Sequence, residues 1–151
     1  MILDYRDELS RTAGPPATSK QSIVGVAATP IVGGRVKDAG AARDWASGET
    51  KHTYVRTVDA LVGATGGVQV DIVAADNEAL TTNPVVLSTI TILAAAFLAN
   101  ELHAMPALKA GSQKRYLGAK FTPLTTASTA GSLICGFTDK NGRPQNSANA
   151  I

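Results

Sequence analysis

The sequence predicts an all-β fold, an antiparallel β-sandwich or jelly roll with extended N- and C-terminal arms. Two observations support this prediction. About eight short runs rich in Val, Ile and Thr recur at intervals of roughly ten residues, and turns containing Gly or Pro separate them. The apolar residues are mostly Ala, Val, Leu and Ile, with only three Phe, three Tyr and one Trp, and this composition suits packed sheets better than an aromatic-lined cavity.

The length of 151 residues is that of one ordinary domain. We assign residues 22–138 to the sandwich, residues 1–21 to an N-terminal arm and residues 139–151 to a polar C-terminal tail. The Gly-Pro-Pro sequence at 14–16 stops any helix and favours an extended path for the arm. We therefore expect the sandwich to stay folded when residues 1–20 are removed.

The first part of the sandwich has an irregular sequence. Residues 22–32 are largely apolar but contain a Gly and a Pro, which favours a short or bulged edge strand. A further short strand is expected at 35–37. Residues 38–50 follow neither the helical nor the strand period, so they predict an ordered surface loop in which Trp45 covers one end of the core.

Three successive strands are predicted at residues 51–61, 68–72 and 85–92. Apolar and polar residues alternate in the second, and the third is mostly β-branched. The glycines within residues 63–67 predict a tight hairpin turn between the first two strands. Because no helix separates these strands, we expect them to pair in antiparallel fashion.

Residues 93–105 fit either a helix or a strand. Their apolar residues fall near helical spacing and their alanines favour a helix, but the segment follows a strand directly and has no N-cap signal. We favour a strand within residues 99–105. Beyond it, residues 115–121 and 132–137 are predicted as strands, the last of them buried because its apolar run is nearly continuous.

No group of residues argues for catalysis, a cofactor or a metal. His52 and His103 lie in expected strands, without a Cys or a second His at metal-ligand spacing. Cys135 is the candidate nucleophile of a cysteine hydrolase, but its apolar neighbours predict a buried, unreactive thiol. Asp71, Asp76 and Glu78 lack the spacing of a calcium-binding loop, so a solvated turn is favoured.

The charge and the apolar runs argue against nucleic acid and membranes as partners. A formal net charge of +2 is too small to indicate nucleic-acid binding. The longest apolar run, residues 92–99, is too short to cross a bilayer, and the first residues lack a signal-peptide pattern. The single cysteine excludes an intramolecular disulfide and fits a protein made in a reducing cytoplasm.

Several short motifs occur in an order that resembles a known family. They are the opening Met-Ile-Leu-Asp, the Asp38-x-Gly40 step followed by Ala46–Glu49 and a strand, the strand at 68–77, the strand ending Met105-Pro106, the Arg115–Leu117 strand, and a last strand running into a polar tail. In this order the chain resembles the small jelly-roll cement or decoration proteins encoded beside the major capsid protein in some tailed phages. The chain departs from that pattern by a longer, Pro-rich segment between Ser10 and Gly33.

The resemblance implies a structural protein without enzymatic activity. Members of the family dimerise and lock adjacent capsomers together, so the implied partners are the major capsid protein and a second copy of the chain, and the implied location is the capsid surface of a virion assembled in the host cytoplasm. The resemblance also implies a set of residues that face these neighbours: Met1, Ile2, Leu3, Asp4 and Tyr5 at the N-terminus, and Arg43 and Trp45 in the predicted loop.

Two other functions remain as alternatives. A jelly-roll module that binds carbohydrate or a receptor would present exposed aromatic residues on a sheet face, and the few aromatic residues support this poorly. A cysteine hydrolase that uses Cys135 is less favoured, because nothing near it in the sequence would stabilise a thiolate.

Overall fold

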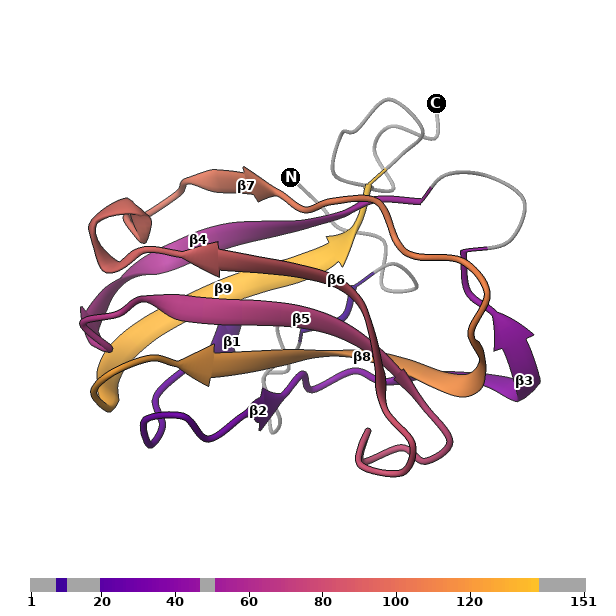
Figure 1. Ribbon diagram of the computed structural model, residues 1–151. Helices are drawn as coiled ribbons and strands as arrows, with labels where there is room; N and C mark the ends of the chain where they lie inside the picture. The colour runs from indigo at the N-terminus through magenta and orange to yellow at the C-terminus, as the bar shows by residue number, and fades with distance from the viewer. Residues whose placement is uncertain (1–7, 11–19, 47–50, 139–151) are drawn as a thin grey trace.

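The computed structural model describes residues 8–10, 20–46 and 51–138, and it confirms an all-β sandwich (Figure 1). Sheet A has the strand order β1-β9-β4-β7, and sheet B has the order β2-β8-β5-β6, with β3 also paired to β8. The strands are β1 (Gln21–Ser22), β2 (Ile31–Val32), β3 (Lys37–Asp44), β4 (Thr53–Gly63), β5 (Val68–Ala75), β6 (Val85–Ile92), β7 (Leu102–Ala104), β8 (Gln113–Pro123) and β9 (Ser128–Phe137).

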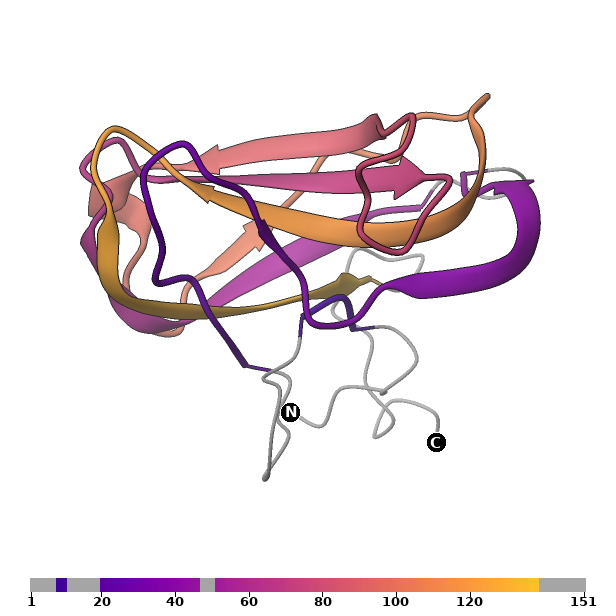
Figure 2. The same ribbon diagram turned by 90° about the horizontal axis from the view of Figure 1, so that it is seen from below.

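The strand pairs are nested in the manner of a jelly roll. The innermost pair is β5 with β6, followed by β4 with β7, then β2 and β3 with β8, and finally β1 with β9. Every one of these pairs is antiparallel, and successive pairs lie in opposite sheets. Figure 2 shows one of the resulting crossings, where the chain leaves β1 in one layer and reaches β2 in the other. The jelly-roll topology follows from this nesting.

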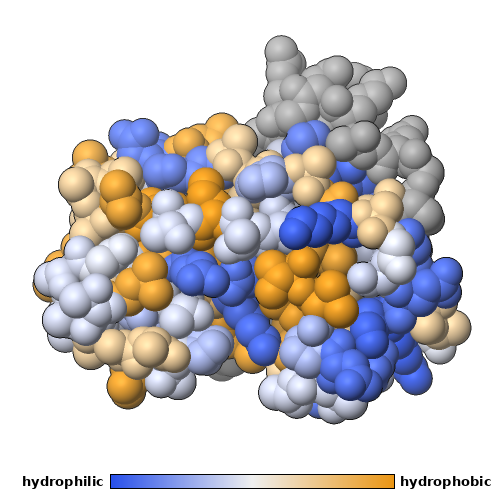
Figure 3. Space-filling view, viewed as in Figure 1, coloured by the Kyte–Doolittle hydropathy of each residue, from blue (hydrophilic) through white to orange (hydrophobic). Residues whose placement is uncertain are grey.

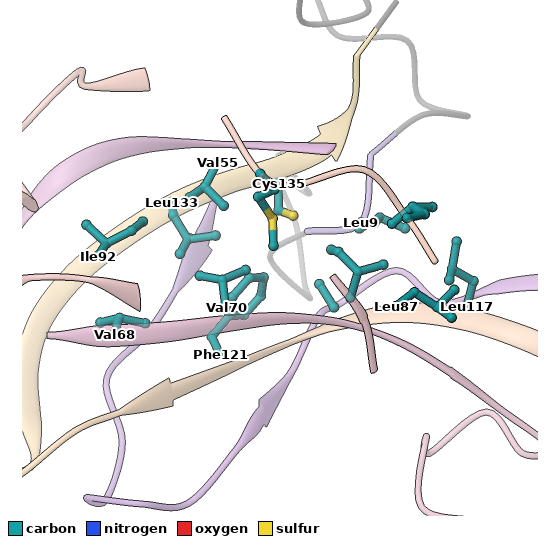
Figure 4. Packing of buried hydrophobic residues seen from close by; sticks show 14 of the residues in the cluster. Leu9, Val55, Val68, Val70, Leu87, Ile92, Leu117, Phe121, Leu133 and Cys135 are labelled. Carbon is teal, nitrogen blue, oxygen red and sulfur yellow. The ribbon is translucent and has the colours of Figure 1, made fainter. Parts of the chain in front are cut away.

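The core lies between the two sheets and is built from alternate residues of each strand. On β5, Val68, Val70 and Ile72 are buried, while Gln69 and Asp71 point to the outer face. Leu133 and Cys135 of β9 meet them from sheet A, so the inner faces of both sheets contribute (Figure 4). Burial of each large side chain contributes roughly 1.5–3 kcal/mol.

The glycine-rich segment at 63–67 does not form the predicted hairpin. Strands β4 and β5 belong to opposite sheets, and the segment between them crosses from sheet A to sheet B. The segment between β8 and β9 also crosses from one sheet to the other. The backbone N–H of Ala64 donates to the carbonyl oxygen of Ala127 at 3.0 Å, and this bond joins the two crossing segments. Positive φ angles were expected at Gly63, Gly66 and Gly67, and this is correct for Gly63 (+79°) and Gly67 (+91°) and wrong for Gly66. The pairing was wrong because a tight turn specifies a change of direction and does not specify which strand becomes the neighbour.

The predicted loop at 38–50 is also corrected. Strand β3 occupies residues 37–44 and pairs with β8, with a shift in register between Asp38 and Arg43. Its side chains are mostly exposed, and the irregular register removes the alternation by which a strand is recognised in a sequence. Trp45 follows β3 and is buried at one end of the core, as predicted. Its indole Nε1–H donates to the carbonyl oxygen of Lys114 at 2.9 Å.

The ambiguous segment at 93–105 contains a short 3-10 turn, η1 (Ala94–Ala96), followed by strand β7. The preference for a strand within 99–105 is confirmed at Leu102–Ala104. No α-helix occurs in the described ranges of the chain.

Residues 8–10 lie within the range assigned to the N-terminal arm, yet they pack on the sandwich. The backbone N–H of Leu9 donates to the carbonyl oxygen of Cys135 at 2.8 Å, and the hydroxyl of Ser10 accepts a hydrogen bond from the Cys135 N–H at 2.9 Å. The Leu9 side chain is fully buried in the core. The remaining arm residues, 1–7 and 11–19, and the tail at 139–151 lie outside the described residues.

Candidate partner-binding surface

Four connections between strands meet at one end of the sandwich, on the left in Figure 1, and they contain a single charged residue, Glu101 beside β7. We call this surface the uncharged end. It consists of residues 23–30, 64–67, 93–100 and 124–127.

Backbone hydrogen bonds join the connections of the uncharged end to one another and to the sheets. The N–H of Ser128 donates to the carbonyl oxygen of Gly25 at 3.0 Å, and the N–H of Gly66 donates to that of Leu124 at 3.2 Å. The N–H of Leu61, near the end of β4, donates to the carbonyl oxygen of Phe97 at 3.3 Å. These bonds satisfy backbone polar groups that would otherwise need water, so they hold the connections together without solvent.

Large exposed hydrophobic side chains concentrate at the uncharged end. In the described part of the chain eight such side chains are exposed, and six of them lie in the uncharged end or directly beside it. Each of the six is more than half exposed: Val24, Val26, Val62, Leu93, Leu98 and Leu102. Single exposed apolar residues are ordinary on protein surfaces, but their concentration in an area with few charges is typical of a protein–protein contact.

The opposite end of the sandwich is charged, and hydrophilic colouring gathers on that side in Figure 3. Arg115 donates two hydrogen bonds to the carboxylate of Asp38, at 2.7 and 2.9 Å. These bonds, together with one from the Gly40 N–H, lower the pKa of Asp38 to about 2. Lys114 pairs with Asp76 at 3.2 Å. The molecule is therefore polarised between an apolar end and an ionic end.

Arg43 and Trp45, the described members of the predicted partner-binding set, lie together at the charged end. The Arg43 guanidinium stacks over the Trp45 ring, 5.0 Å from its centroid. The indole is only 8% exposed, whereas Arg43 is exposed. Arg43 is thus the accessible member of this pair. The other predicted residues, 1–5, lie outside the described part of the chain.

The uncharged end was not predicted from the sequence, although a signal was present. The chain carries no charge from residue 121 to residue 138, and none from 85 to 100. Those segments were interpreted only as strands and turns, because their convergence at one end depends on the jelly-roll crossings.

The surroundings of Cys135 in the core do not favour a nucleophilic cysteine. Cys135 has no exposed surface, and burial raises the pKa of its thiol to about 12. Val55 pairs with Cys135 on one side and with His103 on the other, so the cysteine and the histidine are two strands, or roughly 10 Å, apart. That separation is too long for the hydrogen bond by which a base activates a thiol.

The described aromatic side chains are buried or half-buried, which gives little support to a carbohydrate-binding sheet face. Within the described ranges, no three His, Cys, Asp or Glu side chains come together in a way that could hold a metal ion. No described helix is long and apolar enough to cross a membrane. No protein-family model matches the chain, and no curated protein sequence is significantly similar to it.

Proposed function

We propose that this chain is a structural protein of a phage virion that binds the outside of the capsid as a homodimer and bridges neighbouring major capsid protein subunits. The observation that carries the proposal is the uncharged end, where exposed Val and Leu side chains gather on a rigid jelly roll. The order of sequence motifs supplies the identity of the partner.

The physical logic of such a role does not require a deep pocket. A decorating protein occupies many equivalent places on a shell, so a modest contact in each copy is repeated over the whole particle. Burial of exposed Val and Leu side chains stabilises each contact by roughly 25 cal/mol per Å² of apolar surface. Burial of an unpaired charge would oppose it, so an uncharged surface is suited to an apolar patch on the capsid.

The proposal is tested by binding to phage shells that lack this chain. The variant L93E/L98E places two carboxylates at exposed positions of the uncharged end, so its fold should be unaffected. We expect it to lose at least about tenfold in affinity in a co-sedimentation assay, because the carboxylates must be desolvated in the contact.

The matched control is Val86→Glu, which adds a carboxylate at an exposed valine on β6, away from the uncharged end. It should bind shells as the wild type does. Wild-type protein that does not bind shells would rule out the proposed function. Normal binding by L93E/L98E would rule out the uncharged end as the contact surface.

A further inference from the structure

Strand β6 is a lateral edge of sheet B. Its register with β5 shifts between Val86 and Ser88, but its second half, Thr89–Ile92, pairs regularly and lacks the features that normally protect an edge strand. Its eight residues, Val85–Ile92, include no charged residue and no proline. The opposite edge of the same sheet is formed by β2 and β3, and β3 carries four charged residues, Lys37, Asp38, Arg43 and Asp44. Proteins protect exposed edges with charges and bulges because open N–H and C=O groups pair with other chains.

One half of the β6 edge is already covered by the chain itself. The backbone N–H of Lys109 donates to the carbonyl oxygen of Leu87 at 2.9 Å, and the hydroxyl of Ser88 donates to that of Pro106 at 2.7 Å. For the other half, Thr89–Ile92, the described residues supply backbone hydrogen bonds only from the β5 side. This open half leads directly into Leu93 of the uncharged end.

We propose that the open half of β6, Thr89–Ile92, accepts an extended, uncharged segment of the capsid protein as an added strand. This inference rests on the proposed function and specifies how the partner is held. The segment at 106–109 already contacts this edge through one backbone hydrogen bond and one side-chain hydrogen bond. A capsid segment that crosses the uncharged end would reach the open half without a turn, because the two surfaces are continuous.

The side chains of the open half define the chemistry of the added strand. Ile90 and Ile92 face the core, while Thr89 and Thr91 are exposed on the outer face. An added strand should therefore carry apolar residues toward the core and small polar residues outward, alternating with period two.

A second copy of this chain fits the open half less well. Antiparallel pairing of two β6 strands would be limited to four residues, because the segment at 106–109 covers the rest of each edge. In such a pair, residues 106–109 of one copy would also collide with Leu93 of the other copy. A capsid segment has no such symmetry constraint, so it can continue past Leu93 onto the uncharged end.

Hydrogen exchange on the full-length chain, alone and bound to shells, tests this inference. We expect outward-facing amides within Thr89–Ile92 to exchange quickly in the unbound protein and at least about tenfold more slowly on the shell. The variant T89K/T91K should bind shells at least about tenfold more weakly, because lysines on an edge oppose strand addition. The control T122K places one lysine on the outer face of β8, an interior strand of sheet B, and should bind normally.

Each outcome separates the inference from the proposed function. Shell binding without slower exchange in β6 overturns the added strand and leaves the function standing. Absence of shell binding overturns both. If the unbound protein sediments as a dimer whose β6 amides are already protected and lose protection on dilution, the occupant is a second copy and the inference is wrong.

Discussion

Leu80 and Gly118 make a close contact on the outer face of sheet B. The loop between β5 and β6 folds back so that Leu80 is fully buried against Val73 and Ala75. A Cβ on residue 118 would lie 2.7 Å from Leu80 Cδ1 and 3.1 Å from a Val36 methyl group. The absence of a side chain at residue 118 therefore lets the loop cover the sheet.

Gly118→Ala should lower the free energy of unfolding by about 1–3 kcal/mol, because the added methyl group pushes Leu80 out of its site. Urea denaturation measures the change. The double variant G118A/L80A should lose less than the sum of the two single losses, since removal of the Leu80 methyl groups removes the clash. Additive losses would show that the two residues do not compete for this space.

Asp38 should titrate far below the range of an ordinary carboxylate. Its pKa is lowered to about 2 by the hydrogen bonds of Arg115 and then by that of the Gly40 N–H. Because the folded-state pKa lies below the unfolded value near 3.9, the stabilisation is present above about pH 4 and is lost as the pH falls through about 2.

Arg115→Gln should raise the pKa of Asp38 toward its ordinary value and flatten the pH dependence of stability between about pH 4 and pH 2. NMR titration of the Asp38 carboxyl carbon and urea unfolding at several pH values measure these two effects. Arg56→Gln is the control, because that guanidinium donates to the Asn100 amide oxygen, at 3.5 Å. An unchanged Asp38 titration in R115Q would contradict the assignment.

At the scale of elements, residues 8–10 belong to the sandwich. Leu9→Ala should lower the free energy of unfolding by about 2–5 kcal/mol, because it leaves a cavity in the core. Leu98→Ala, at a side chain that is 53% exposed, should change it by less than about 0.5 kcal/mol. Removal of residues 1–20 should therefore destabilise the fold, contrary to the expectation from the sequence. A stable, fully folded truncation would show that Leu9 is dispensable.

The strands that were predicted correctly are those whose own composition is typical of a strand. Residues 85–92 are mostly β-branched and coincide with β6, and the runs at 115–121 and 132–137 lie inside β8 and β9. Strand β3 was missed because an exposed edge strand with shifted register buries no regular face. The false hairpin at 63–67 arose because sheet assignment depends on partners far along the chain, which local turn chemistry does not encode.

In the candidate site, too, local features could be predicted from the sequence and features that depend on distant segments could not. The buried, unreactive Cys135 could be inferred from its apolar neighbours, because burial of a short strand is a local property. The uncharged end could not, because Val24, Val62 and Leu93 are distant in sequence and only the crossings bring their connections together. Uncharged composition is visible in each segment, but its convergence is visible only in the fold.

At the scale of the whole molecule, the two ends of the jelly roll offer different kinds of contact. The charged end presents Arg43 over Trp45 and the Asp38–Arg115 pair, so a contact there would depend on ionic strength. The uncharged end would bind through apolar burial, which moderate salt does not screen. In a test of the proposed function, salt dependence would therefore report which end of the sandwich makes the contact.

If the chain binds phage shells as proposed, we expect binding to change by less than about threefold between 50 and 500 mM sodium chloride, because few charges lie near the contact surface to be screened. Co-sedimentation at a series of salt concentrations measures this. Arg43→Gln should leave both the affinity and its salt dependence unaltered, since Arg43 lies at the other end of the sandwich. A fall in affinity of about tenfold or more with salt, abolished by R43Q, would instead place the capsid contact at the charged end.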